Sequence, residues 1–138
     1  MDHPWRRLRD LADWLLGWAH LPGDLRGLTH FGARVIVLDP RLLQAERRCT
    51  IAHELEHVAR GPSPADPVMR AREEAAIDRA VARRLIAIRD LGEALAWSLD
   101  LDEAAAELWV DRPTLEARLR SLHPSERAYL RRRLEHHE

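Results

Sequence analysis

The chain has 138 residues, which is enough for one domain but few for two. Hydrophobic residues make up 46% of it and charged residues 33%, proportions that are typical of a globular protein and exclude a disordered one. The formal net charge of −1 gives no overall attraction to nucleic acid, and the single cysteine excludes an internal disulfide and a four-cysteine zinc site. No charge-free stretch approaches the ~20 residues that span a bilayer, and the N-terminus lacks the pattern of a secretory signal. We therefore expect a cytoplasmic protein that does not contact a membrane.

The N-terminal part of the chain contains a predicted helix followed by two predicted strands. Apolar residues at spacings of three and four over residues 5–19 predict an amphipathic helix, which ends at Leu21-Pro22-Gly23-Asp24. Residues 25–30 and 34–38 follow, and the second stretch holds the only β-branched run, Val35-Ile36-Val37. The two stretches predict a β-hairpin with Gly32 in its turn.

The remaining sequence predicts helices. Asp39-Pro40 marks a turn or a helix start, and a helix is established by Glu46 and ends near Gly61, where a proline-rich loop begins. Another helix is expected over residues 68–88, and two or three more over 91–137. The expected fold class is therefore α+β: a mostly helical single domain with a small antiparallel hairpin or sheet packed beside the helix that ends near Gly61.

The string His53-Glu54-Leu55-Glu56-His57 lies on that helix. Residues four apart on a helix lie about 40° apart around its axis, so the two imidazoles can converge on one zinc ion. Glu54 would lie beside the metal without binding it, where it can take a proton from water and pass it to a leaving amine. This is the H-E-x-x-H signature of zinc peptidases.

The faces of this helix agree with a metal site. The apolar residues form one stripe, and His53 and His57 lie on roughly the opposite side; the stripe consists of Ile51, Ala52, Leu55, Val58 and Ala59. We expect the helix to pack its apolar side on the core and to turn its histidines toward a cleft. The alternative is a solvated helix face that happens to carry two histidines.

A catalytic zinc ion needs a third protein ligand and one open position. On the next helix Glu74 falls within the angular range of the buried stripe, where an acid is costly unless it is paired or bound to metal. Glu74 is therefore the expected ligand, and Asp78, four residues on, is expected to accept a hydrogen bond from a ligating histidine. Glu73 or Asp78 could be the ligand instead. Alternatively, Glu74 and Asp78 could form surface ion pairs with Arg70, Arg79 or Arg83.

A family resemblance covers roughly residues 25–88. The quoted motifs are Arg48-Cys49-Thr50-Ile51-Ala52-His53-Glu54-Leu55-Glu56-His57, then Glu74-x-x-x-Asp78 and Ala82-x-x-Leu85-Ile86. This pattern resembles the ImmA/IrrE metallo-endopeptidases of bacteria and phages. The resemblance implies that His53, His57 and Glu74 bind the metal and that Glu54 is the general base. It also implies a zincin-like core over residues 1–90, followed by a helical extension over 91–138 within the same compact domain. Known members cleave helix-turn-helix repressors, which implies a repressor-like substrate.

Residues 101–119 resemble a helix-turn-helix, with Trp109 in place of the usual turn glycine. A reading helix should present polar and basic side chains to base edges. Asp111 and Glu116 dilute the positive charge of the arginines, which are Arg112, Arg118 and Arg120. We therefore favour a helical cap over the core, or a surface that docks a partner, over DNA binding.

Several further residues were considered for chemistry. Cys49 is expected to be a buried, unreactive side chain. The five tryptophans are expected in the core; they are Trp5, Trp14, Trp18, Trp97 and Trp109. Three histidines outside the motif are candidates for stabilising the oxyanion of a tetrahedral intermediate; they are His20, His30 and His123.

The leading hypothesis is a zinc-dependent endopeptidase that acts on a regulatory protein, in which water attacks a peptide carbonyl polarised by the metal and Glu54 assists. A second hypothesis is a non-catalytic module that docks a transcription factor or DNA through residues 91–135. A third is a purely structural zinc site, which would require a fourth protein ligand.

Overall fold

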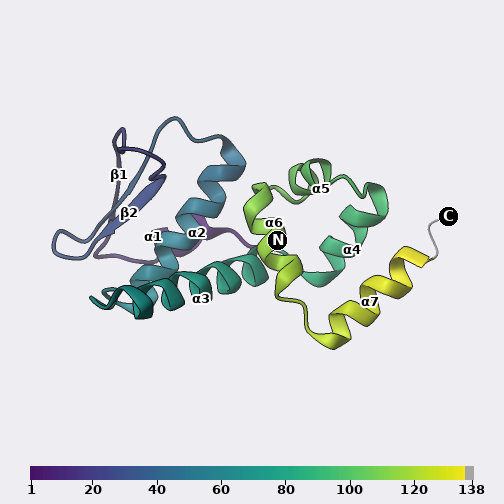
Figure 1. Ribbon diagram of the computed structural model, residues 1–138. Helices are drawn as coiled ribbons and strands as arrows, with labels where there is room; N and C mark the ends of the chain where they lie inside the picture. Colours follow the sequence, from purple (N-terminus) through teal and green to yellow (C-terminus); the bar gives the residue numbers. More distant parts are fainter. Residues whose placement is uncertain (136–138) are drawn as a thin grey trace.

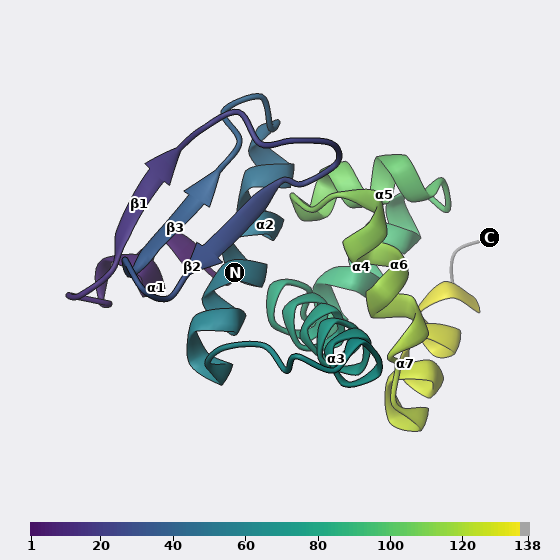
Figure 2. The same cartoon turned by 60° about the vertical axis from the view of Figure 1, so that its left-hand side comes forward.

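The computed structural model describes residues 1–135, in which a small sheet and a group of C-terminal helices lie on opposite sides of one long helix, α2 (Figures 1 and 2). The order of elements combines a mixed sheet with seven helices over the described residues, so the fold class is α+β, as expected. The elements are α1 Pro4–Arg9, β1 Leu15–Trp18, β2 Gly27–His30, β3 Val35–Leu38, α2 Gln44–Arg60, α3 Pro67–Leu85, α4 Ile88–Trp97, α5 Leu101–Leu108, α6 Arg112–Arg120 and α7 Pro124–Glu135. The last three residues of the expected extension, 136–138, lie outside the described part.

The helix expected over residues 5–19 is wrong in its second half. α1 ends at Arg9, and Leu15–Trp18 forms β1, which pairs in parallel with β3 (Leu15↔Val35 to Trp18↔Leu38). A short apolar segment fits a helix and a strand almost equally well, and pairing with the β-branched strand β3 decides between them. The side chain of Leu16 accordingly packs against the buried cluster that contains Ile36.

The sheet has the strand order β1-β3-β2, so β2 is an edge strand. The predicted hairpin is confirmed: β2 and β3 are antiparallel, with Leu28 opposite Val37 and His30 opposite Val35. On the face toward α2, Ile36 and Leu38 are fully buried. They pack against Ile51 and Leu55 of α2, and β2 also contacts α2, so the edge strand lies beside the helix that carries the motif.

α2 buries two faces rather than the single apolar stripe expected from its sequence. Ile51 and Leu55 face the sheet, whereas Cys49 and Ala52 belong to the cluster that the C-terminal helices form. The expected stripe also included Ala59, which is exposed near the end of the helix. The prediction named only one buried face, so it underestimated how deeply the middle of α2 is buried.

The start of α2 is also later than Asp39-Pro40. The carboxylate of Glu46 accepts the backbone N–H of Leu43 at 2.9 Å and caps the helix there. Asp39 instead fixes the preceding loop, since it accepts the backbone N–H of Leu21 at 3.0 Å and pairs with Arg41. The Arg41 guanidinium and the backbone N–H donors hold the pKa of Asp39 well below its usual range.

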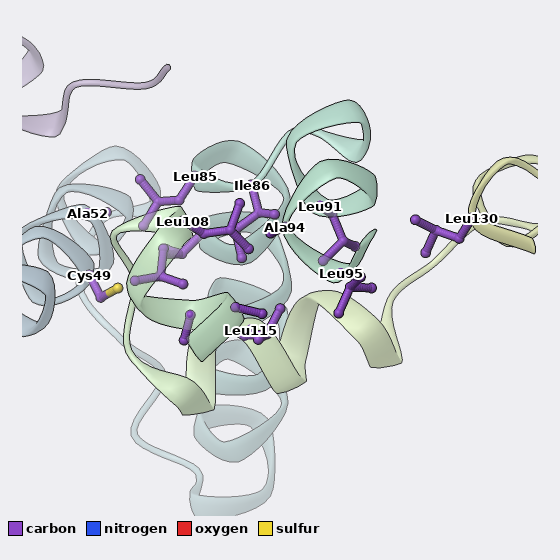
Figure 3. Close-up of a cluster of buried hydrophobic side chains, with 14 of the residues drawn as sticks. Cys49, Ala52, Leu85, Ile86, Leu91, Ala94, Leu95, Leu108, Leu115 and Leu130 are labelled. Carbon is purple, nitrogen blue, oxygen red and sulfur yellow. The ribbon is translucent and has the colours of Figure 1, made fainter. Parts of the chain in front are cut away.

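The C-terminal helices share a core with α2 and α3 (Figure 3). α3 begins at the N-cap Asp66, whose carboxylate accepts the N–H of Val68 at 2.8 Å. Four helices follow α3, not two or three, because the chain turns once more at Trp109, which has a left-handed backbone (φ 61°). The core of this half contains residues from α2 to α7, among them Ile77, Leu85, Leu91, Leu108, Leu115 and Leu130.

A buried arginine on α2 connects the two halves of the chain. Arg48 is only 6% exposed, and its guanidinium donates to the backbone oxygens of Trp109 at 2.9 Å and Asp2 at 3.1 Å. Longer contacts reach the oxygens of Leu108 at 3.3 Å and Leu85 at 3.5 Å, the last residues of α5 and α3. Carbonyls at helix C-termini lack partners within the helix and carry the negative end of its dipole, so one cation serves both ends.

A second buried arginine joins α6 and α7. Arg118, which is 2% exposed, lies 2.6 Å from the carboxylate of Glu126, and Arg83 of α3 binds the same carboxylate at 3.0 Å. The hydrogen bond from Arg118 is the main reason why the pKa of Glu126 lies well below its usual range. Because Arg118 is buried in this pair, it is not available to a partner.

The expectation that all five tryptophans lie in the core is wrong. Trp18, Trp97 and Trp109 are 47%, 64% and 53% exposed, while Trp5 and Trp14 pack against the cluster between the sheet and α2. Within residues 1–135, no helix has the length and apolar character needed to cross a membrane.

Candidate metal centre

The side chains of His53, His57 and Glu74 converge between α2 and α3. The carboxylate of Glu74 lies between the two imidazoles, with Oε2 at 3.0 Å from Nε2 of His53 and Oε1 at 2.8 Å from Nε2 of His57. One ligand atom from each residue falls within 4.8 Å of the others. The helical spacing thus brings both rings to one point, with centroids 5.0 Å apart, and α3 supplies the acid.

This donor set fits a divalent metal ion. Two imidazole nitrogens and one carboxylate are a usual combination of protein ligands in catalytic zinc sites. Each imidazole uses its Nε2 atom toward Glu74, so both rings present the same kind of donor to the shared space. The group of His53, His57 and Glu74 could therefore hold a metal ion.

The other two acids of α3 lie against the outer nitrogens of the same rings. Asp78 Oδ1 is 3.3 Å from Nδ1 of His53, whereas Glu73 Oε1 is 3.9 Å from Nδ1 of His57, beyond hydrogen-bond distance. Glu73 instead accepts the hydroxyl of Ser63 at 3.1 Å. This placement favours Glu74 over the alternative ligands, and it puts Asp78 where it can orient His53.

The expectation that Glu74 lies on the core side of α3 is wrong. The side chain of Glu74 is 43% exposed and that of Glu73 only 17%, so Glu74 is not the acid on the core side of α3. Glu74 faces a solvent-filled cleft, which a helical wheel does not distinguish from the core. No salt bridge among the described residues joins Glu74 or Asp78 to an arginine, which removes the surface-pair alternative.

The protonation of His53 reflects its acidic surroundings. Burial alone lowers the pKa of this imidazole, but the hydrogen bond with Asp78 and the charges of Glu54 and Glu74 outweigh burial. The pKa of His53 is therefore raised above its ordinary value. The carboxylates that favour the imidazolium in this way would equally favour a metal cation in its place.

Glu54 is buried on the sheet side of the histidines. It is 6% exposed, and its Oε2 atom accepts a hydrogen bond from the hydroxyl of Thr29 on β2 at 2.7 Å. The sequence predicted the position of Glu54 beside the metal but not its partner. Thr29 belongs to no sequence motif. The one indication that it could contact Glu54 was that its strand precedes the helix that carries the motif.

These residues line a cleft of about 640 Å³ whose walls are β2, α2, α3 and α6. Thr29, Glu54, both histidines and Glu74 lie on one part of the lining, and Thr114 and Ala117 of α6 lie on another. The α6 N-cap residue, Asp111, also binds Arg26 at 3.0 Å, which joins α6 to the loop before β2. The C-terminal helices thus complete the cleft.

The helix-turn-helix resemblance is realised as α5 and α6, and α6 both packs on α3 and lines the cleft. Leu115, Ala117 and Arg118 of this helix are buried. A recognition helix presents one face to the major groove, whereas α6 turns Thr114 and Arg120 toward the cleft. The geometry therefore favours the interpretation of this segment as a cap over the interpretation as a DNA reader.

Cys49 also lines the cleft. It is 5% exposed, and burial raises the pKa of its thiol to about 11, with a further contribution from Asp111. Such a thiol is unreactive at neutral pH, in agreement with the expectation. The oxyanion candidates His20, His30 and His123 are absent from the lining, and Nδ1 of His30 accepts the N–H of Ala33 within the hairpin turn.

Comparison with known families agrees with the motif and the geometry. The family model of the IrrE N-terminal-like domain, a peptidase family, matches residues 19–136. The chain belongs to this family. The resemblance noted in the motif is thereby confirmed, and the match extends through the C-terminal helices. Membership supports a metallopeptidase-type function and implies a protein substrate. Among curated proteins, no sequence matches the chain significantly.

Proposed function

We propose that this protein is a zinc-dependent endopeptidase in which His53, His57 and Glu74 bind the metal and Glu54 is the general base. The observation that carries the proposal is the convergence of these three side chains within 4.8 Å, next to a buried glutamate in a cleft. A structural zinc site would require a fourth protein ligand, and no fourth residue joins this group among the described residues.

The chemistry divides between the metal and the protein. A bound zinc ion supplies a Lewis acid that polarises a peptide carbonyl and lowers the pKa of water. Glu54 takes the proton from the attacking water and gives it to the leaving amine, for which its position one residue after His53 is suitable. Asp78 holds the imidazole of His53 in one orientation through Nδ1.

The edge strand β2 offers a site for an extended peptide. Because Asp39 N–H donates to Arg26 O at 2.9 Å, the alternation of antiparallel pairing leaves the backbone groups of Gly27 and Thr29 turned away from β3. Both residues line the cleft. A substrate segment that adds to this edge would run past the metal ligands, as in other cases of strand addition.

The proposal also includes a substrate and a location in the cell. We propose a regulatory protein, such as a helix-turn-helix repressor, as the substrate, and the cytoplasm of a bacterium as the location. The support for this substrate is the family resemblance, which implies that known members cleave such repressors. Incubation of the protein with helix-turn-helix repressors from the same organism tests it: a single specific cleavage in one of them is expected, and a set of repressors that all stay intact would contradict this substrate.

Metal analysis of purified protein tests the site. Wild type is expected to contain one equivalent of zinc, and His57→Ala and Glu74→Gln to contain almost none. His123→Ala and Glu73→Gln are matched controls, since His123 lies outside the cleft and Glu73 is not directed at the shared space, and both should keep the metal. Metal-free wild type, or equal loss in Glu73→Gln and Glu74→Gln, would contradict the assignment.

Cleavage of fluorescein-labelled casein tests the enzymatic role. Glu54→Gln is expected to retain zinc but to lose ~10²–10⁴-fold in rate, the usual contribution of a general acid–base group. Glu56→Gln is the matched control, because Glu56 lies on the same helix and pairs with Arg60 outside the cleft. If Glu54→Gln cleaved as fast as Glu56→Gln, the role of Glu54 as the base would be wrong.

A further inference from the structure

The hydroxyl of Thr29 fixes one oxygen of the proposed base. Thr29 Oγ1 lies 2.7 Å from Oε2 of Glu54, and because an ionised carboxylate only accepts, the hydroxyl is the donor. Oε1 of Glu54 has no hydrogen-bond partner among residues 1–135. The two oxygens of Glu54 are therefore in different situations: one is held by the sheet, and the other remains available in the cleft.

A close approach of β2 to α2 makes this contact possible. A Cβ atom on Gly27 would lie 2.7 Å from Cγ2 of Thr50 and 3.3 Å from Cγ of Glu54, which is too close for any other residue without a shift. Thr29 is two residues further along β2, so its side chain points to the same side as that missing Cβ. The absence of a side chain at Gly27 thus brings the Thr29 hydroxyl within reach of Glu54.

Fixing a carboxylate matters for proton transfer. A glutamate side chain has three rotatable bonds, and a general base acts only from rotamers that direct an oxygen at the proton. A hydrogen bond to a charged group is among the stronger ones in proteins, enough to select one orientation. With Oε2 held by Thr29, Oε1 is the oxygen that exchanges the proton.

We propose that Thr29 is a positioning residue, which holds Glu54 in the orientation needed for proton transfer. Its kinetic consequence rests on the proposed peptidase function, whereas the orientation of Glu54 is a structural property that is tested separately. Thr29 also lies on the edge strand that we expect to bind the substrate. The same strand would therefore place the peptide and orient the base.

The variants Thr29→Val and Thr29→Ser separate the hydroxyl from the shape of the side chain. Valine has nearly the size of threonine but no hydroxyl, and serine keeps the hydroxyl. On a quenched fluorescent peptide that wild type cleaves, Thr29→Val is expected to lower kcat ~10–100-fold, the usual effect of losing a group that orients a catalytic residue, with little change in KM. Thr29→Ser should retain most of the activity. Zinc content and melting temperature should match wild type in both variants.

Crystal structures of the two variants give a second measurement that does not depend on activity. The carboxylate of Glu54 is expected to stay in place in Thr29→Ser and to change rotamer or become disordered in Thr29→Val. An unchanged Glu54 in Thr29→Val would overturn the proposal, as would equal kcat values for wild type and Thr29→Val. Loss of zinc from Thr29→Val would show a structural role instead. If wild type cleaves no substrate, the proposed function fails, and the position of Glu54 still decides the inference about Thr29.

Discussion

Replacement of Arg48 by methionine should weaken the attachment of the C-terminal helices. The guanidinium makes two firm hydrogen bonds, at 2.9 Å to Trp109 and 3.1 Å to Asp2, and two longer contacts to helix ends. Hydrogen bonds from a charged donor contribute about 1.5–3 kcal/mol each, so the firm pair gives about 3–6 kcal/mol. Burial opposes this, because desolvation lowers the pKa of Arg48. Methionine removes that cost and fills much of the volume, so we expect a net loss of about 3 kcal/mol.

Urea denaturation measures this loss. With an m-value of about 2 kcal/mol/M, a loss of about 3 kcal/mol lowers the midpoint by about 1.5 M. Arg84→Met is the matched control, since Arg84 is an exposed residue of α3 and should shift the midpoint very little. Hydrogen exchange should locate the effect. Relative to wild type, the Arg48→Met substitution should speed the exchange of amides in α5 and α6 more than that of amides in β3. A midpoint equal to that of Arg84→Met would refute the reasoning that Arg48 holds the helix ends.

Three further predictions follow from single contacts. Glu126→Gln removes the partner of the buried Arg118 and should cost about 2–4 kcal/mol at pH 7. The folded-state pKa of Glu126 is depressed, so the difference in unfolding free energy between wild type and Glu126→Gln should be largest above pH ~4.5 and should shrink as the pH falls below that value. Melting curves at pH 7 and pH 3 would show this. Asp78→Asn, which weakens the support of His53, should lower zinc affinity ~10–100-fold in chelator competition, and equal affinity would exclude the orienting role. Gly27→Ala places a Cβ 2.7 Å from a methyl group of α2 and should cost about 1–3 kcal/mol by urea denaturation; unchanged stability would show that β2 can shift freely.

The sequence predicted those parts of the site that depend on local helix geometry. His53 and His57 converge because helical spacing alone brings residues four apart to one side. Glu74 was chosen for a wrong reason, its supposed burial, and it still reaches the histidines because the cleft and the core lie in neighbouring directions around α3. The hairpin was predictable for a similar reason, since a β-branched run follows a turn signal within a few residues.

Features that depend on contacts distant in sequence were not predictable. β1 was assigned to a helix because its pairing with β3, twenty residues away, leaves no local pattern. Thr29 was overlooked because its importance arises from a hydrogen bond to Glu54 across the interface between β2 and α2. Arg48 was quoted as part of a motif, yet nothing local indicates that its guanidinium reaches Trp109, which lies 61 positions further along the chain.

These long-range contacts determine how the two parts of the chain should be regarded. We propose that residues 91–135 belong to the peptidase fold itself and are not an appended binding module. Ile77 and Leu85 of α3 are buried in a cluster completed by α4 to α7, so α3 would expose them without the extension. α6 lines the cleft that also contains His53, His57 and Glu74, and Asp111 at its start forms an ion pair with Arg26 beside the edge strand. Because His53, His57 and Glu74 lie on α2 and α3, a change in α6 would alter the shape of the cleft without replacing any of these three residues, so α6 is where we expect a substrate or partner to influence the proposed cleavage.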